Sequence, residues 1–407
     1  MKLYNFNCRC CSSDRLKSVC DLGLQPWGND FVPIEEGGSK DLYPLELFYC
    51  EDCGMVQLSY TVPKEKMFMN HSYLSGTTKT LQLHFVNVGK QFELKFPFLK
   101  KSKILDVGGN DGTFLKFFKD NDYTVVNVDS GVLQSDLARS SGITTYNTFF
   151  NEASAEKILK DCGKFKAIHG SGIFFHLEEL HSAFQGLKML LDVDGVLIAE
   201  FIYLPEMMRK VAYDQIYHEH LLYYSLTTFN RLLSMFGLEV FDVHFAPIHG
   251  GTCIAYAGHP NHYPKTDSLK TALNDEESSG ILTYDKMKEF EVQIKKNGST
   301  LKNIVSDIKK EGKTIYCLGA PVKGTTLLHF SQLSEKEISY ATEVNEHKCG
   351  TYYPGTKIPV VLQGSVPEPD YYLLLAWNFQ EEILPRLEDF RKNGGKVIIP
   401  VPEARVI

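Results

Sequence analysis

A glycine-rich turn between an apolar strand and an apolar helix constrains the fold more than any other feature of this 407-residue chain. The segment is ILDVGGNDGTFL, residues 104–115. We predict a strand over 103–107 and a helix that starts at 113. This arrangement commonly places a nucleotide-like ligand at a helix N-terminus. The G-G-x-x-G spacing differs from the dinucleotide pattern G-x-G-x-x-G, and no lysine follows the turn as it would in a P-loop.

Two acids end consecutive predicted strands. Asp106 directly precedes the turn, and Asp129 ends the strand that begins at Tyr123. A carboxylate before the turn would repel a pyrophosphate but suits a cationic ligand such as S-adenosylmethionine. An acid at the end of the second strand can hold both ribose hydroxyls, although NAD-binding folds also carry one there. The residues predicted to bind S-adenosylmethionine at this turn are Asp106, Gly108, Asn110, Gly112 and Asp129. The alternative is an α/β unit that binds nothing here.

The following strands and helices come in the order of a class I methyltransferase. A strand over 166–172 ends in the loop HGSG, where Gly170 and Ser171 are further predicted cofactor contacts. An amphipathic helix over 175–191 follows, and then a D-G turn and a buried strand that ends at Phe201. We predict an α/β fold with a Rossmann-like methyltransferase domain over 66–260.

Six of the ten cysteines lie in the first 53 residues. Cys8 and Cys11 form one CxxC pair, and Cys50 and Cys53 form a second. Two such turns offer four thiolates, a closed tetrahedral set that suits a structural zinc ion. Free thiols or a redox pair are alternatives, but neither pair has a thioredoxin-like context. We predict a zinc-binding module over 1–65, with Cys10 as a possible substitute ligand.

A second strand, glycine turn and helix begins after a polar helical connector predicted over 261–312. The segment is KTIYCLGAPVKGTT, and strands are expected again near 340–344, 371–376 and 396–400. We therefore predict a second Rossmann-like domain over 313–407. No acid precedes this turn and Lys323 lies inside it, which favours an anion beside Gly319. The alternative is a decayed duplicate that only packs.

Titratable and aromatic side chains are unusually dense in YDQIYHEHLLYYS, residues 213–225. His218 and His220 could ligate a metal, but they lack the i, i+4 spacing of a zinc helix. A single histidine at such a place is usually a satisfied packing residue. A Tyr-x-Glu-His cluster after a cofactor fold is more typical of acid–base chemistry.

The chain resembles the sugar C-3-methyltransferases that make branched deoxysugars of the tetronitrose type on a nucleotide carrier. The resemblance runs almost end to end. Its motifs are the double CxxC, EDCGMVQL, VPKEKMF, GGNDG, DQIYHEH, PIHGG, GAPVKGTT, PDYYLLLAWNF and the terminal VPE. The chain departs from the family at two places. It has Asp106 and Gly109 where the family often has glutamate and a cysteine inside the turn. Its HGSG loop is smaller than that of relatives near the expected substrate, so the identity of the substrate stays open.

The resemblance implies a set of roles. His220 would remove the C-3 proton of a 4-keto sugar nucleotide, and the enolate would attack the methyl group of S-adenosylmethionine. Glu219 would orient or polarise the site, and Tyr217 would bond the ketone or enolate oxygen. Tyr73 and His176 match further active-site residues. His249 lies in a family motif, and the C-terminal domain, with Gly319 and Lys323, would help to hold the nucleotide sugar.

Other activities and partners follow from the same features. The base could instead take a hydroxyl or amine proton, which would make the protein an O- or N-methyltransferase, or the fold could be an inactive zinc-bearing scaffold. The net charge of -7 and the pI of about 6.0 argue against a nucleic-acid partner. No apolar run approaches the roughly 20 residues of a membrane span. We expect a cytoplasmic protein with a nucleotide-sugar substrate and favour a monomer.

Overall fold

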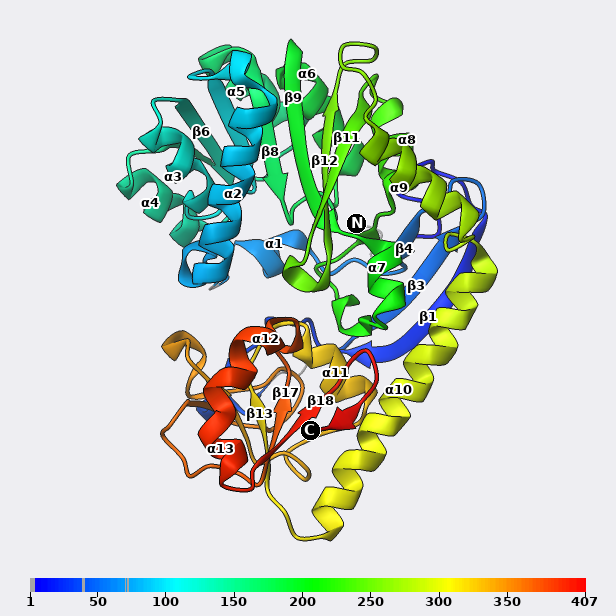
Figure 1. The fold of residues 1–407 in the computed structure, drawn as a ribbon, viewed down its shortest axis with the longest axis vertical. Coiled ribbons are helices and arrows are strands. Elements are labelled where there is room, and N and C mark those ends of the chain that lie inside the picture. The colour runs from blue at the N-terminus through cyan, green and yellow to red at the C-terminus, as the bar shows by residue number, and fades with distance from the viewer. Residues whose placement is uncertain (1–3, 39–40, 70, 72) are drawn as a thin grey trace.

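The computed structural model describes residues 4–38, 41–69, 71 and 73–407. Two bodies lie one above the other in Figure 1, with the N-terminal strands and a long helix running along one side of both. Within the described residues, no helix combines the length and the apolar character that crossing a membrane requires.

The upper body is built on a seven-stranded sheet in the order β11-β12-β9-β8-β5-β6-β7. Strands β5 to β9 pair in parallel, and β12 pairs antiparallel with both of its neighbours. The strands are β5 (Lys103–Val107), β6 (Thr124–Asp129), β7 (Thr144–Asn147), β8 (Phe165–Ser171), β9 (Leu191–Ile202), β11 (Glu239–Ala246) and β12 (Thr252–Gly258). The helices are α2 (Lys79–Lys95), α3 (Thr113–Asp120), α4 (Val132–Ser140), α5 (Glu152–Cys162), α6 (Leu180–Leu190), α7 (Leu204–Arg209) and α8 (Leu226–Ser234).

Alternation along β5 shows why helices cover both faces of this sheet. Ile104 packs in one core cluster with the apolar residues of α2 and α3. The next residue, Leu105, packs in the other cluster with those of α5 and α6. A strand that is apolar on both faces needs cover on both, as parallel strands in α/β folds do.

The lower body is built on a six-stranded sheet in the order β16-β14-β13-β17-β18-β19, parallel except for β19. Its strands are β13 (Ile315–Leu318), β14 (Tyr340–Glu343), β16 (Val360–Leu362), β17 (Tyr371–Leu374), β18 (Lys396–Ile399) and β19 (Arg405–Val406). Its helices are α11 (Gly324–Phe330), α12 (Gln380–Ile383) and α13 (Glu388–Lys392). Strand, glycine turn and helix therefore recur here as a second Rossmann-like unit.

The N-terminal module joins both bodies through backbone pairing. It contains β1 (Leu16–Gln25), β2 (Val32–Pro33), β3 (Tyr43–Cys50), β4 (Val56–Leu58) and α1 (Lys64–Phe68). Strand β4 pairs with β10 (Leu222–Tyr223), which belongs to the upper body. Strand β2 pairs with β15 (Thr351–Tyr352), which comes from the C-terminal domain. The module is thus hydrogen-bonded to each of the other two domains.

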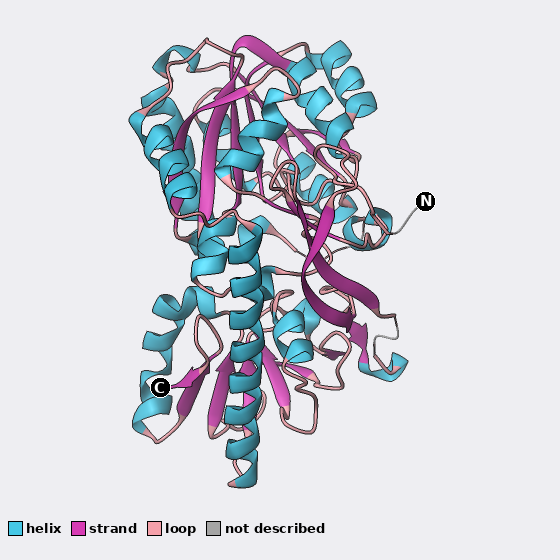
Figure 2. Ribbon diagram, turned by 90° about the vertical axis from the view of Figure 1, so that its right-hand side faces the viewer, coloured by secondary structure: helices cyan, strands magenta, loops and turns pink. Residues whose placement is uncertain are grey.

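Helices α9 (Asp267–Ser278) and α10 (Tyr284–Lys310) connect the two bodies. Figure 2 shows α10 crossing from one body to the other along the face of the molecule. Near its start, the Tyr284 hydroxyl donates to the Ser18 carbonyl of β1 at 2.9 Å. Further along, the Asn297 amide donates to the Pro400 carbonyl at 2.8 Å and its oxygen accepts from the Ala404 N–H at 2.7 Å. Helix α10 is therefore hydrogen-bonded to both the N-terminal module and the C-terminal domain.

Candidate functional site

The four cysteines of the two CxxC pairs form one group. Their sulfur atoms all lie within 4.8 Å of one another, with Cys8 Sγ 3.4 Å from Cys53 Sγ and Cys11 Sγ 3.6 Å from Cys50 Sγ. Four thiolates about 2.3 Å from a tetrahedral zinc ion would stand about 3.8 Å apart. The donor set therefore fits a closed structural zinc site. Cys10 is buried beside it but is not one of the four.

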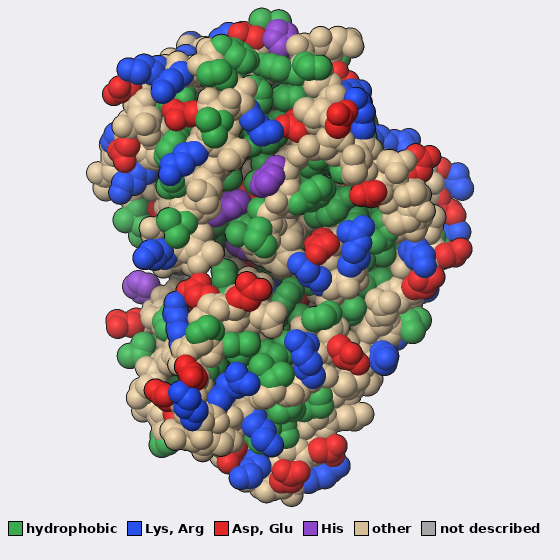
Figure 3. All heavy atoms as spheres, in the orientation of Figure 1, with side chains coloured by type: hydrophobic (Ala, Val, Ile, Leu, Met, Phe, Trp, Pro, Cys, Tyr) green, Lys and Arg blue, Asp and Glu red, His purple; other side chains and the backbone are tan. Residues whose placement is uncertain are grey.

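A separate cavity of about 460 Å³ lies where the three modules meet. Its wall includes Asn29 from the N-terminal module, Asn110 and His220 from the methyltransferase domain, and Lys323 and Lys348 from the C-terminal domain. Figure 3 shows histidine side chains beside the hollow between the two bodies. The carboxyl ends of β5, β6 and β8 open onto this cavity, which is where α/β sheets bind their ligands.

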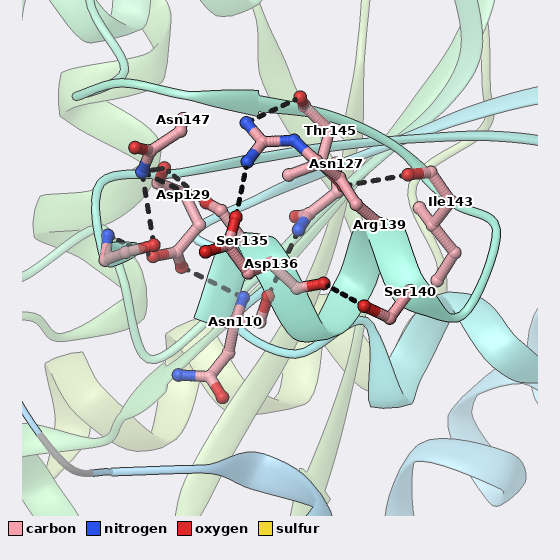
Figure 4. Close-up of polar contacts among 11 residues, drawn as sticks. Asn110, Asn127, Asp129, Ser135, Asp136, Arg139, Ser140, Ile143, Thr145 and Asn147 are labelled. Atoms are coloured by element: carbon pink, nitrogen blue, oxygen red, sulfur yellow. Dashed lines mark hydrogen bonds and ion pairs between the residues drawn. The ribbon is translucent and has the colours of Figure 1, made fainter. Parts of the chain in front are cut away.

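Asp129, at the end of β6, lines the cavity with a carboxylate held by two backbone amides (Figure 4). Its Oδ2 accepts from the Asn110 N–H at 2.9 Å, and its Oδ1 accepts from the Gly131 N–H at 2.7 Å. A carboxylate has about four acceptor positions, so two remain for ribose hydroxyls. Burial raises the pKa of Asp129 to about 6, and the two amide donors oppose that shift.

Asp106 is placed differently from the sequence prediction. It is buried inside β5, does not line the cavity, and its Oδ1 lies 2.7 Å from Nδ1 of His169. Burial raises the pKa of Asp106, and His169 opposes the shift. Gly109 passes so close that a Cβ would come within 2.6 Å of Asp106 Oδ2 and 2.3 Å of Asn127 Oδ1. Asp106 therefore lies beneath the turn, in contact with His169 and close to Gly109.

The remaining predicted cofactor residues divide into two groups. Gly108, Asn110 and Ser171 line the cavity. Gly112 and Gly170 do not. Gly112 has φ 80 at the start of α3, and a Cβ on Gly170 would lie 2.6 Å from the Phe174 ring. These two glycines shape the turns, because a side chain would be strained at one and would clash at the other.

A segment preceding α2 lies across the cofactor turn. The Asn110 amide nitrogen donates to the Tyr73 carbonyl at 3.2 Å, and its side-chain oxygen accepts from the Ser75 N–H at 2.9 Å. Asp111 Oδ2 accepts from the Gly76 N–H at 2.9 Å. Tyr73 lines the cavity, although 49% of its surface is exposed to solvent. Asn110 thus ties the segment that carries Tyr73, a predicted active-site residue, to the glycine turn.

His220 lines the cavity with a defined tautomer. Its Nδ1 lies 2.8 Å from the Gln215 carbonyl oxygen, which can only accept, so Nδ1 carries the proton. Neutral imidazole then has its lone pair on Nε2, and no described protein group bonds to that atom. Burial holds the pKa of His220 well below its usual value, and neighbouring His176 acts in the same direction. The ring is therefore neutral at physiological pH.

Aromatic rings surround this imidazole. The centroid of the His220 ring lies 3.9 Å from that of Tyr217, 4.5 Å from that of Phe175 and 5.2 Å from that of His176. All four line the cavity. Burial lowers the pKa of His176 to about 3 and raises that of Tyr217 well above 10, so both are neutral. The predicted helix over 175–191 begins only at Leu180, and Phe175 and His176 lie before it in a segment that lines the cavity.

Glu219 interacts with one side chain of the N-terminal module and one of the C-terminal domain. Its Oε1 accepts from the Asn29 amide at 2.8 Å, and the Lys348 charge acts on it. Burial raises the pKa of Glu219 to about 7, against the effect of both neighbours. His218 stands between Tyr217 and Glu219 in the chain but does not line the cavity. Its Nε2 lies 3.3 Å from the Pro44 carbonyl of β3. His218 is therefore a packing contact with the N-terminal module.

Lys323 lines the cavity, but its charge is already paired. Its Nζ lies 3.2 Å from Asp214 Oδ2 and 4.1 Å from the centre of the Trp377 ring, and Trp377 Nε1 donates to the same Asp214 oxygen at 2.5 Å. Gly319 has φ 81 and does not line the cavity. His249 does line it, with φ 52, and its carbonyl accepts from the Gln215 amide at 2.8 Å.

Several cavity residues were not found from the sequence. Asn29 and Lys348 come from segments far from the motifs. Glu200, in β9, is buried and accepts from Ser171 Oγ at 3.1 Å and Thr252 Oγ1 at 3.0 Å, and His84 Nε2 lies 2.9 Å from it. An acid inside the apolar strand VLIAEF was the available signal for Glu200. Asn29 and Lys348 had no comparable local signal.

Comparisons with known proteins agree with this architecture. Three family models match: a candidate zinc-binding domain over residues 8–68, a methyltransferase domain over 87–243, and a C-methyltransferase C-terminal domain over 247–402. The chain is 30% identical to C-methyltransferase NovU of Streptomyces niveus over 404 residues, 98% of this chain and 96% of that protein.

Solved structures share a smaller part of the chain. The S-adenosylmethionine-bound magnesium protoporphyrin IX methyltransferase of Synechocystis is 13% identical, with a TM-score of 0.34 over 44% of this chain and 79% of that one. A protein of Pyrococcus horikoshii is 14% identical, with a TM-score of 0.35 over 46% and 94%. The end-to-end match to NovU, the three family models and the zinc and cofactor sites together show that the chain belongs to the family of S-adenosylmethionine-dependent C-methyltransferases with a structural zinc module, as its motifs indicated.

Proposed function

We propose that this enzyme methylates carbon 3 of a nucleotide-linked 4-keto deoxysugar, with His220 as the general base. The observation that carries the proposal is the hydrogen bond from His220 Nδ1 to the Gln215 carbonyl, because it leaves the Nε2 lone pair available in the cavity, where the neighbouring His176 and Tyr217 rings are neutral. A 4-keto group acidifies the neighbouring C–H, and a neutral imidazole can accept that proton.

The chain's residues would divide the work as follows. His220 takes the proton from carbon 3, and the Tyr217 hydroxyl donates a hydrogen bond to the enolate oxygen as charge develops there. Tyr73 and His176 close the cavity around the reacting carbon. S-adenosylmethionine, held by Asp129, the 108–112 turn and Ser171, supplies the methyl group. Carbon 3 exchanges a bond to hydrogen for a bond to methyl, and the proton stays on His220.

Proton removal can be tested separately from methyl transfer. The probe is dTDP-4-keto-2,6-dideoxyglucose in D2O with S-adenosylhomocysteine in place of the methyl donor, and exchange at carbon 3 is followed by NMR. The wild-type enzyme should exchange that proton. His220→Asn should lose about 10²- to 10⁴-fold in exchange and in turnover, while S-adenosylmethionine binds within about twofold of wild type.

Two further measurements complete the test. His262→Asn changes an exposed histidine outside the cavity and should leave both rates unchanged. With the methyl donor present, the product should show one added methyl group on a quaternary carbon 3. Wild-type exchange by His220→Asn would overturn the base assignment. A methyl group on oxygen or nitrogen would replace the enolate route with direct O- or N-methylation.

A further inference from the structure

Three lysines line the cavity, and they differ in how their charges are balanced. Lys64 lies 2.6 Å from Glu179, and Lys323 lies 3.2 Å from Asp214. Lys348 has no such partner: among the described residues, no carboxylate oxygen comes within 4.0 Å of its Nζ. One cation facing the cavity is thus without an adjacent counter-charge.

The ammonium group of Lys348 has neutral neighbours. It donates to the Ala320 carbonyl at 2.8 Å and stands 4.5 Å from the centre of the Phe31 ring. An ammonium has three N–H donors, so two remain for a ligand. Burial lowers the pKa of Lys348, with Glu343 and Glu219 acting in the opposite direction from a distance. Removing a cation from water without a counter-ion is unfavourable, and an anion in the cavity would reverse that cost.

The position of Lys348 fits the part of a nucleotide sugar that carries negative charge. Ala320, which it contacts, belongs to the second glycine turn, and the following Pro321 and Val322 line the same wall. The charge of Lys348 also interacts with that of Glu219, the neighbour of His220 in the chain. A sugar placed against His220 would therefore have its diphosphate near Lys348 and the 320–323 loop, with the nucleoside beyond.

We propose that Lys348 supplies the uncompensated charge that binds the diphosphate of the nucleotide-sugar substrate. This inference deepens the proposed function and rests on it. Lysine commonly binds phosphate as a point charge, and two oxygens of a diphosphate can accept its two free N–H groups. The charge of Lys323 is already compensated by its ion pair with Asp214, whereas that of Lys348 is not.

The test is binding of nucleoside diphosphates without chemistry, measured by calorimetry with S-adenosylhomocysteine bound. dTDP, UDP, GDP, CDP and ADP are screened on the wild-type enzyme, and the tightest is compared with its unphosphorylated nucleoside. Lys348→Gln should weaken binding of the diphosphate by about 10- to 100-fold and binding of the nucleoside by less than about twofold. Lys348→Arg should recover most of the loss. Lys64→Gln, a cavity lysine paired with Glu179, should have no effect on the diphosphate.

The possible failures are distinguishable. If the wild type binds a nucleoside diphosphate and Lys348→Gln binds it equally well, the assignment of Lys348 is wrong and the proposed substrate stands. If Lys348→Gln weakens binding of the nucleoside and of the diphosphate by the same factor, Lys348 shapes the site but does not compensate the charge of the phosphates, and the assignment is again wrong. If no nucleoside diphosphate binds the wild type, the nucleotide-sugar substrate is wrong and the assignment falls with it. Unchanged S-adenosylhomocysteine affinity verifies that each variant is folded.

Discussion

At the scale of single residues, burial moves the pKa values of two adjacent side chains in ways that both favour the neutral form. It holds the pKa of His220 well below the ordinary imidazole value and raises that of Glu219 to about 7. Desolvation penalises whichever form is charged, so it disfavours imidazolium and carboxylate alike. The base therefore stays unprotonated across the neutral range, while the acid changes charge within it.

The pH dependence of substrate binding should follow Glu219. Its raised pKa keeps it protonated below about pH 7, and above that value it becomes a carboxylate whose negative charge acts on Lys348 from a distance and opposes the diphosphate. We expect the KM for the nucleotide sugar to rise as pH increases through about 7, with no matching change in S-adenosylmethionine affinity. Glu219→Gln, which keeps an acceptor for Asn29, should give a KM independent of pH between 6 and 8.5, values spanning about one unit or more on each side of the transition. A wild-type KM that is flat over this range would contradict the prediction.

The sequence predicted the cavity-lining side chains of residues 217–220 better than it predicted which charges are compensated. Residues 217–220 could be recognised because they are contiguous, and the His220–Tyr217 contact lies within that one segment. Lys323 attracted attention because it stands inside a glycine turn, but its pairing with Asp214 joins residues more than a hundred positions apart. Such a long-range pair leaves no local pattern, so the sequence could not show that Lys323 is neutralised or that Lys348 is not.

At the scale of elements, the turn between β5 and α3 was predictable because its requirements are local. Gly109 has no room for a Cβ, and Gly112 has a positive φ, so the sequence needs glycine at both. The helix expected over 175–191 was too long because hydrophobic spacing does not tell whether a side chain packs on a sheet or faces a cavity. Phe175 and His176 belong to the second kind.

Asn110 offers a test of how the segment over the turn affects cofactor binding. Its side chain bonds Tyr73 and Ser75, and its own φ is 52, a conformation that glycine adopts without strain. Asn110→Gly should therefore keep thermal stability but release the segment. We expect S-adenosylmethionine affinity to fall about 10-fold and the Ser75 amide to exchange faster with deuterium. Asn110→Asp retains the acceptor for Ser75 and should show a smaller exchange change; equal protection of Ser75 in all three proteins would contradict the role of this contact.

At the scale of the whole molecule, the segment 214–220 holds the three modules together. Asp214 bonds Trp377 and Lys323, the Ile216 carbonyl accepts from Thr326 Oγ1 at 2.7 Å, and Glu219 accepts from Asn29. His218 meets β3. The existence of three modules was predictable from the cysteine pairs and the two glycine turns. Their convergence on one seven-residue stretch was not, because it depends on how the modules dock.

The zinc module should affect the two halves of the cavity unequally. Asn29 and Phe31 belong to it and stand beside Glu219 and Lys348, whereas the 108–112 turn belongs to the methyltransferase sheet. We expect zinc in the purified protein by mass spectrometry. Cys50→Ser/Cys53→Ser should lose the metal and weaken nucleoside diphosphate binding about 10-fold or more, with S-adenosylmethionine binding changed by less than about threefold. Cys317→Ser, at a cysteine outside the cluster, is the control. Full diphosphate affinity in the metal-free protein would contradict this coupling.

The contacts of segment 214–220 also limit how this enzyme can be recombined. A chimaera could take the C-terminal domain of a relative in order to change the accepted nucleotide. Asp214 and Ile216 would then have new neighbours, and His220, which lies in the same segment, would be displaced. Successful grafts should carry the Lys323, Thr326 and Trp377 contacts with them, or exchange residues 214–220 together with the incoming domain. In this architecture, a change of the domain that would set the accepted nucleotide also changes the contacts that position His220.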